Sequence, residues 1–313
     1  MLNPGSLTTL TRIRELDLSA ATSSGQHPYL SAASGLVRAD PYLYVVADDE
    51  LHLGVFASTD IKPGHLIRLF TGELPASRAK RKKRKPDLET LVRLPAFAGY
   101  PHGALFAIGS GSKPNRRLGA LLTLNAQGAV TGTARVVDLA NMFAALHDDV
   151  TALNIEGGIV RDDELCLLQR GNKGNGRNAL IRFHLLPLLE MLGSRAGIAR
   201  VAPFAIHPVD LGSIAGVPLG LTDGAALPNG DIVFSAVAEN QEDNYNDGPC
   251  VGAALGVLNK DGNLRCLHRL DQAHKIEGID ASLESGVIRL LLVTDADDAN
   301  IPASLYSAAL AAE

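Results

Sequence analysis

The sequence predicts an all-β protein, specifically a five-bladed β-propeller built from four-stranded antiparallel blades. An acidic residue followed by glycine recurs at the start of apolar strands, and each copy runs into further short strands separated by Gly, Asn, Asp and Pro turns. Repeated four-stranded units favour a propeller, because radial repetition leaves only short, protected sheet edges. A pair of β-sandwiches is the alternative, but it does not explain the recurring acid–glycine positions.

Five anchor positions define the repeat. The segments "NIEGGIV", "LTDGAAL" and "KIEGIDA" supply Glu156, Asp223 and Glu277. Two weaker copies lie upstream, where a serine takes the acid position at Ser34 and a threonine follows Glu89. The anchors are 54 to 67 residues apart, a spacing typical of propeller blades with insertions.

These anchors divide the chain into blades. We expect a single domain over residues 1–313, with blades at about 30–72, 86–139, 153–211, 219–271 and 274–312. The last unit ends after three strands, and the N-terminal strand at 9–19 is expected to supply its fourth. Helical periodicity is limited to 138–149 and 185–193, which we interpret as insertions between strands.

Composition limits the function classes. The net charge of −5 over 313 residues is too mild for a nucleic-acid-binding protein, although a basic run, "SRAKRKKRKP" at 77–86, could bind a polyanion. Such a run is more typical of an exposed loop, here bordering the second anchor. The N-terminus has no apolar targeting segment, and no stretch approaches the roughly 18 apolar residues that span a bilayer. We expect a cytoplasmic monomer or weak dimer without membrane or nucleic-acid partners.

The anchors also predict a metal site. The innermost strand of each blade lines the central channel of a propeller, so one anchor per blade would face the axis. Four carboxylates gathered there would repel one another, and a hard divalent cation would neutralise them. We therefore expect Ca²⁺, or else Mg²⁺, to be bound by the five anchors Ser34, Glu89, Glu156, Asp223 and Glu277. A water-filled polar channel without metal is the alternative.

The loops that follow the second strand of each blade should share a face with the anchors. The second and third of these loops have a common G-x-K-x-N-x-R pattern, at 111–117 and 171–177. Cationic side chains beside the channel suit an anionic small molecule, since guanidinium groups match phosphate and carboxylate. The expected substrate-binding residues are Lys113, Arg116, Arg117, Lys173 and Arg177. Alternatively, these loops are polar only because they are solvated.

The ordered segments resemble the soluble calcium-activated nucleotidases, or apyrases. The likeness lies in "ASGLVRADPYLYVVADD", "PDLETL", "NIEGGIVRDDELCLLQR" and "KIEGID", and it also extends to bacterial propellers described as phytase-like or esterase-like. It implies a five-bladed fold with calcium on the inner strands, and it implies that Asp48 and Arg170 face the substrate. The chain departs from that family where Asp223 replaces a serine and where Glu239 stands in place of a lysine.

The expected function is metal-dependent hydrolysis of a phosphorylated or other anionic small molecule. The metal would polarise the substrate, Asp48 would accept a proton from water, and Arg170 would stabilise the developing charge. Two alternatives remain open. One is a calcium-stabilised binding propeller without enzymatic activity, and the other is a lactonase or esterase that uses the same channel metal.

Overall fold

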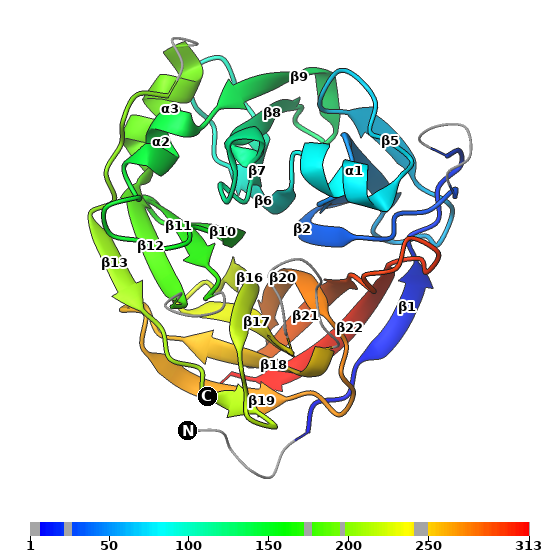
Figure 1. Ribbon diagram of the computed structural model, residues 1–313, viewed down its shortest axis with the longest axis vertical. Helices are drawn as coiled ribbons and strands as arrows, with labels where there is room; N and C mark the ends of the chain where they lie inside the picture. The colour runs from blue at the N-terminus through cyan, green and yellow to red at the C-terminus, as the bar shows by residue number, and fades with distance from the viewer. Residues whose placement is uncertain (1–6, 22–26, 172–176, 195–197, 241–249, 313) are drawn as a thin grey trace.

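Five four-stranded antiparallel sheets surround a central axis, which confirms the predicted five-bladed β-propeller (Figure 1). The structure is a computed structural model that describes residues 7–21, 27–171, 177–194, 198–240 and 250–312. Within each blade the chain runs from the axis outward. The innermost strands of neighbouring blades pack against one another, and together they close a ring.

The first three blades follow one another along the chain. Blade 1 consists of β2 (Ala33–Ala39), β3 (Tyr42–Ala47), β4 (His52–Ala57) and β5 (His65–Arg68). Blade 2 consists of β6 (Leu88–Leu94), β7 (Ala104–Gly109), β8 (Leu118–Leu124) and β9 (Val130–Asp138). Blade 3 consists of β10 (Ile155–Arg161), β11 (Glu164–Gln169), β12 (Ala179–His184) and β13 (Ala205–Pro208).

The fifth blade closes the ring with strands from both ends of the chain. Blade 4 consists of β16 (Gly220–Ala226), β17 (Ile232–Glu239), β18 (Cys250–Leu258) and β19 (Leu264–Arg269). Blade 5 consists of β20 (Ile276–Glu284), β21 (Val287–Thr294), β22 (Ser304–Ala311) and the N-terminal β1 (Thr11–Glu15). Strand β1 pairs antiparallel with β22, with Thr11 opposite Ser307, as the sequence predicts.

The remaining elements are short and lie outside the sheets. They are α1 (Arg78–Arg84), the 3₁₀ turn η1 (Pro114–Arg116), α2 (Ala140–Ala144), α3 (Leu185–Ser194) and a hairpin of β14 (Ser213–Ile214) and β15 (Val217–Pro218). Helices α2 and α3 fall at the two predicted insertions. Among the described residues, no helix has the length and apolar character needed to cross a membrane.

Apolar packing between blades provides the core. The described residues form five buried clusters, one between each pair of neighbouring blades. Most residues of the second strands are covered on both faces, and these strands are therefore largely apolar, as in "IVFSAVAE" of β17, whose eight residues are all buried. Helix α3 adds Leu185, Leu188, Leu189 and Leu192 to the cluster between blades 2 and 3. These apolar clusters hold the blades around the axis, and the charged anchor side chains lie in the channel along that axis.

Candidate functional site: a charged channel and its mouth

Each of the five anchors lies at a β-bulge of an innermost strand. The register between the first and second strands shifts by one residue at Ser34, Glu89, Glu156, Asp223 and Glu277. A bulge leaves one residue outside the ladder and re-aims its side chain. The repeat seen in the sequence therefore reflects one backbone irregularity that is shared by all five blades.

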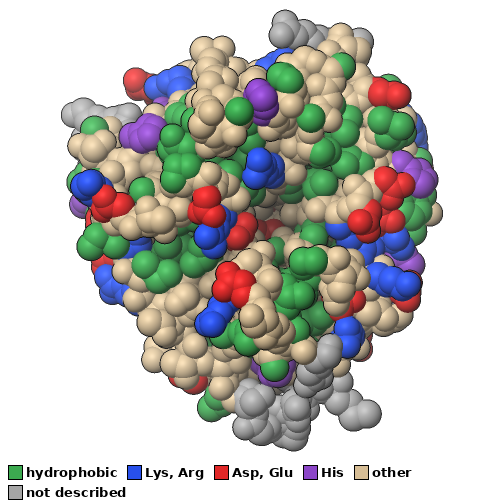
Figure 2. All heavy atoms as spheres, turned by 180° about the vertical axis from the view of Figure 1, so that it is seen from behind, with side chains coloured by type: hydrophobic (Ala, Val, Ile, Leu, Met, Phe, Trp, Pro, Cys, Tyr) green, Lys and Arg blue, Asp and Glu red, His purple; other side chains and the backbone are tan. Residues whose placement is uncertain are grey.

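The glycine after an anchor permits close approach of the inner strands. A Cβ atom on Gly157 would lie 2.6 Å from Asp223 Oδ1 and 2.7 Å from its Cα, and one on Gly278 would lie 3.0 Å from the carbonyl carbon of Gly35. No ordinary side chain tolerates such contacts. The predicted tight packing of the inner strands around the axis is therefore present. Seen from the opposite side, the centre of the molecule is hollowed, with acidic side chains in the hollow (Figure 2).

Two further sets of residues join the anchors in the channel. One set ends or directly follows the second strand of each blade, and comprises Asp48, Ser110, Arg170, Glu239 and Asp295. The other set stands two residues before an anchor, where strand periodicity places a side chain on the same face, and includes Asp87 and Lys275. The channel therefore contains cations as well as carboxylates.

Arg170 and Lys275 are the cations at the centre of the channel. The guanidinium of Arg170 lies 2.6 Å from Glu239, 3.3 Å from Glu156 and 3.7 Å from Glu277. The ammonium of Lys275 lies 3.2 Å from Glu239 and 3.4 Å from Glu277, and it also pairs with the carboxylates of blade 5. All five side chains are almost fully buried, so these ion pairs are shielded from water.

Opposing effects act on the central glutamates. Burial raises the pKa of Glu277 well above its ordinary value, while Lys275 and Arg170 oppose that rise. Burial likewise raises the pKa of Glu156, again against the influence of Arg170 and Lys275. The two internal cations therefore supply much of the neutralisation that the sequence analysis assigns to calcium.

Ser34 and Asp223 are occupied by the backbone. Ser34 Oγ donates a 2.5 Å hydrogen bond to the carbonyl of Leu88. The Asp223 carboxylate accepts hydrogen bonds from the amides of Gly158 and Ile279, at 3.4 and 3.1 Å, which link it to the inner strands on either side. These two anchors hold neighbouring blades together, and calcium binding by all five anchors stays a prediction.

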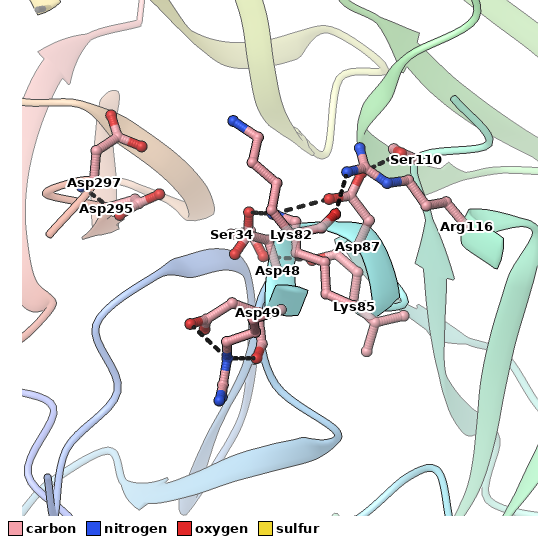
Figure 3. Close-up of polar contacts among 12 residues, drawn as sticks. Ser34, Asp48, Asp49, Lys82, Lys85, Asp87, Ser110, Arg116, Asp295 and Asp297 are labelled. Atoms are coloured by element: carbon pink, nitrogen blue, oxygen red, sulfur yellow. Dashed lines mark hydrogen bonds and ion pairs between the residues drawn. The ribbon is translucent and has the colours of Figure 1, made fainter. Parts of the chain in front are cut away.

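A second charged cluster lies at the channel mouth (Figure 3). The ammonium of Lys85 pairs with Asp48 and lies 2.9 Å from Asp87, while Arg116 lies 2.6 Å from Asp87 on its other side. Ser110 donates a 2.5 Å hydrogen bond to Asp87. One oxygen each from Asp48, Asp87 and Glu89 can lie within 4.8 Å of the others, a separation that suits a shared metal ion.

Glu89 differs from its two neighbours in this trio. It forms no hydrogen bond or ion pair with the residues that the structure describes. Burial raises its pKa well above the ordinary value, and the charges of Glu156, Asp87 and Asp48 raise it further, against the opposing influence of Lys85. Glu89 is thus the anchor whose carboxylate is left for a proton or a bound cation.

The basic run forms a helix over the mouth, so the expectation of a loop is wrong (Figure 1). Its cations at positions 78, 81, 82 and 85 recur at i, i+3, i+4 and i+7, a spacing that places them on one helical face. Arg81 lies 2.8 Å from Glu50 and 3.3 Å from Asp49, and Lys85 reaches Asp48. These ion pairs with blade 1 hold α1 against the channel.

The predicted substrate-binding residues separate into three groups. Arg116 is buried against Asp87. Lys113 lies nearby and is largely exposed, and its remaining partial burial, together with the charge of Arg116, lowers the pKa of Lys113. Arg117 instead contacts His147, 3.2 Å away, beside α2, and Arg177 is exposed. Lys173 lies outside the described residues. The shared loop pattern therefore does not place all its cations at one point.

A cavity of about 300 Å³ opens beside the mouth, between blades 1 and 5 and beneath α1. Asp48, Asp49 and Glu50 of the loop after β3 pair with cations at the α1 end of the cavity, whereas Asp295 and Asp297 of the loop after β21 lie apart from Asp48 (Figure 3). Sequence reasoning missed Asp87, Lys275 and Asp295. The strand period of two identifies the first two, whereas Asp295 is found only by aligning the ends of the second strands.

Comparisons with known proteins place the chain in a family. A model described as a family of unknown function, DUF6929, matches residues 29–310, and the chain belongs to that family. No curated protein matches it.

Solved structures with similar architecture include glutaminyl cyclase of Myxococcus xanthus, at 12% identity over 97% of this chain and 98% of that chain, with a TM-score of 0.47. A putative glycoside hydrolase from Parabacteroides distasonis is 12% identical over 98% and 97%, with a TM-score of 0.46. An α-L-arabinofuranosidase from Fusarium graminearum is 8% identical over 96% and 98%, with a TM-score of 0.42. Likeness at this level carries no conclusion about activity.

Proposed function

We propose that this member of the DUF6929 family is a divalent-metal-dependent hydrolase of a phosphorylated or other anionic small molecule. The observation that carries the proposal is the trio of Asp48, Asp87 and Glu89, whose oxygens can converge within 4.8 Å at the edge of a cavity that cations overhang. Carboxylate oxygens are the ligands that Ca²⁺ and Mg²⁺ prefer. A cation there would sit next to a space large enough for a small substrate.

The trio fits a metal better than the full ring of anchors does. Ser34 and Asp223 bind the backbone, and Glu156 and Glu277 pair with internal cations. In the trio, Asp48 and Asp87 also pair with cations, but Glu89 has no hydrogen bond or ion pair with any described residue, and burial and its neighbours disfavour its charge. A divalent cation would relieve that repulsion.

A metal bound there would act as a Lewis acid towards a phosphoryl or ester oxygen. The chain's own groups would do the rest. Arg78 and Lys82 line the cavity on the α1 side and would orient the anionic group of the substrate. Asp49 lines the same cavity, and because burial and the charge of Asp48 raise its pKa to about 7, it is suited to accept a proton from water near neutral pH.

Two roles expected from the sequence change in this proposal. Asp48 belongs to the carboxylate trio, so we assign it as a metal ligand and give the role of base to Asp49, which lines the cavity. Arg170 is buried among three glutamates, so we assign it to positioning those glutamates and not to contact with the substrate.

The test is a turnover screen of chelator-treated protein against nucleotides, sugar phosphates, phytate and lactones, with Ca²⁺ or Mg²⁺ restored or withheld. We expect metal-dependent turnover of a phosphorylated compound, lost at least 100-fold in Glu89→Gln and unchanged in Glu284→Gln, an exposed control in blade 5. Turnover confined to lactones would support an esterase instead. A metal-dependent shift of the melting temperature without turnover would support a binding propeller. If added metal produced no heat of binding and no melting shift, the metal site would be contradicted.

A further inference from the structure

The cavity beside the mouth has walls of opposite charge. Its volume of about 300 Å³ is at the lower end of small-molecule pockets, equal to the space of roughly ten water molecules. One wall is the inner face of α1. The acidic wall is formed by the loops after β3 and β21, together with the segment that precedes β2. The loop after β3 meets α1 through the ion pairs of Arg81 and Lys85, and the loop after β21 is the part of this wall that lies away from them (Figure 3).

The acidic wall carries more charge than its own cations neutralise. Six carboxylates line the cavity, namely Asp48, Asp49, Glu50, Asp295, Asp297 and Asp298. Arg81, Lys85 and Lys275 are among the cations that pair with them, and Lys85 and Lys275 also pair with carboxylates deeper in the channel. Among the described residues, the Asp298 carboxylate accepts hydrogen bonds of 2.9 Å from the two amide groups of Asn300 and forms no ion pair, although the charge of Arg78 helps to lower its pKa. This wall therefore favours a cationic ligand group.

An aromatic pair adjoins the acidic wall. The rings of His27 and Tyr29 are stacked, with centroids 5.0 Å apart and planes 4° from parallel. Tyr29 Oη donates a 3.3 Å hydrogen bond to the carbonyl of Ala299, which ties the ring to the loop after β21. Aromatic faces next to carboxylates are the surroundings that attract an organic ammonium group.

The opposite wall suits an anion. Arg81 and Lys85 are held by blade 1, whereas Arg78 extends from the first turn of α1 along the cavity. Lys82 lines the cavity one turn further on. A phosphate or carboxylate group that faces Arg78 would meet positive charge without displacing the ion pairs of Arg81 and Lys85 that hold α1 in place.

We propose that the cavity binds a zwitterionic small molecule, with its organic ammonium group against Tyr29 and the acidic wall and its phosphate or carboxylate against Arg78 of α1. This inference rests on the proposed function, because it names the substrate class for the same site. Such a ligand carries both charges, and the width of the cavity sets the distance between them. A compound with only one charge would interact favourably with only one of the two walls.

Calorimetric titration of the full chain with three matched probes tests this. Phosphocholine carries both charges, choline only the cation, and glycerol phosphate only the anion. With chelator present, so that metal affinity does not contribute, we expect phosphocholine to bind at least tenfold more tightly than either of the others. Equal affinity for phosphocholine and glycerol phosphate would overturn the proposal.

Single substitutions test which wall binds the ammonium group and which binds the phosphate. Asp298→Asn keeps the turn at Asn300 but removes the charge, and Tyr29→Leu removes the ring, so each should weaken phosphocholine at least fivefold and leave glycerol phosphate unchanged. Arg78→Met should weaken both phosphorylated probes. Arg84→Met, on the exposed face of α1, is the matched control. Losses as large in Arg84→Met as in Arg78→Met would contradict the assignment.

The two proposals fail separately. Zwitterion binding without metal-dependent turnover of any compound would end the hydrolase proposal and leave this one standing. Metal-dependent turnover of anions that lack an ammonium group, together with no preference for phosphocholine, would support the hydrolase proposal and contradict zwitterion binding.

Discussion

The guanidinium of Arg170 lies 2.6 Å from the carboxylate of Glu239 and bridges blades 3 and 4 at the centre of the channel. Its second nitrogen reaches Glu156 and Glu277, so one cation joins glutamates of three blades. Arginine suits this position because its planar group can donate several hydrogen bonds and stays charged when buried. A propeller axis crowded with carboxylates is thereby held together from within.

Removing that cation should destabilise the protein strongly. Arg170→Met leaves buried glutamates without a counter-charge, and breaking a buried ion pair in this way costs about 3–5 kcal/mol. We expect a loss of this size in urea unfolding. We also expect millimolar Ca²⁺ to restore part of it, because a divalent cation could then take the place of the guanidinium. Arg289→Met, whose side chain is largely exposed, should change little. Full stability of Arg170→Met in the absence of metal would contradict this view of the channel.

The acidic wall predicts a stability that falls as the pH rises. Burial first, and the charge of Asp48 second, raise the pKa of Asp49 from 3.8 to about 7. Between these values the folded protein holds a proton that the unfolded chain has lost. The free energy of unfolding therefore decreases with rising pH, by at most about 1.4 kcal/mol per unit for one group.

Asp295 should behave in the same way, since burial is also the main cause that raises its pKa to about 7. Urea unfolding at pH 5 and pH 8 measures the effect. The difference between the two pH values should shrink in Asp49→Asn and in Asp295→Asn. It should stay as in the wild type in Asp60→Asn, because the hydrogen bond from Lys62 lowers the pKa of that exposed carboxyl, which is ionised at both pH values. An unchanged difference in both wall variants would show that these carboxyls are ionised throughout.

The fold was more predictable from the sequence than the site, because the fold follows from local repeats whereas the site depends on contacts between residues far apart in the sequence. The bulge at Glu156 and the glycine after it recur in the local sequence, so the blades and their closure by β1 follow from repeats alone. The ion pairs of Arg170 and Lys275 join residues 69 and 36 positions apart, respectively, in neighbouring blades. No local pattern encodes such partners, so the sequence did not predict that side-chain cations pair with the anchor carboxylates, and the metal stays a prediction.

The basic run shows the same limit on a smaller scale. Its charges suggested a solvated loop, but their spacing at 78, 81, 82 and 85 already contained a helical face. What the sequence could not supply was the acidic partner surface on blade 1, formed by Asp48, Asp49 and Glu50.

Close packing at the axis predicts that Gly157 cannot be enlarged. The added methyl of Gly157→Ala would lie 2.6–2.8 Å from atoms of Asp223 and Thr222, two of which belong to the backbone. Overpacking of this kind costs about 1–3 kcal/mol. Gly252→Ala is the matched control, because its close contacts are all with the side chain of Ile214 and none is with backbone. Thermal unfolding should show the larger loss in Gly157→Ala, and the opposite order would mean that the inner strands can separate.

Closure of the ring predicts a strong effect at Arg14 of β1. This buried side chain donates hydrogen bonds to the carbonyls of Asp60 and Lys62, at 3.1 and 2.8 Å, and its guanidinium lies 5.2 Å from the ring centroid of Phe56. These contacts link the last blade to the first. Arg14→Met keeps much of the apolar stem but leaves two carbonyls without their charged donor, which should cost about 2–3 kcal/mol.

Arg12→Met on the same strand tests whether closure is the cause. Among the described residues, the Arg12 side chain forms an exposed ion pair with Glu15, and such pairs contribute about 0–1 kcal/mol. We therefore expect Arg14→Met, but not Arg12→Met, to lower the unfolding midpoint and to speed hydrogen exchange at the amides of β1 and β22. Equal exchange rates in the two variants would mean that pairing of β1 with β22 alone closes the propeller.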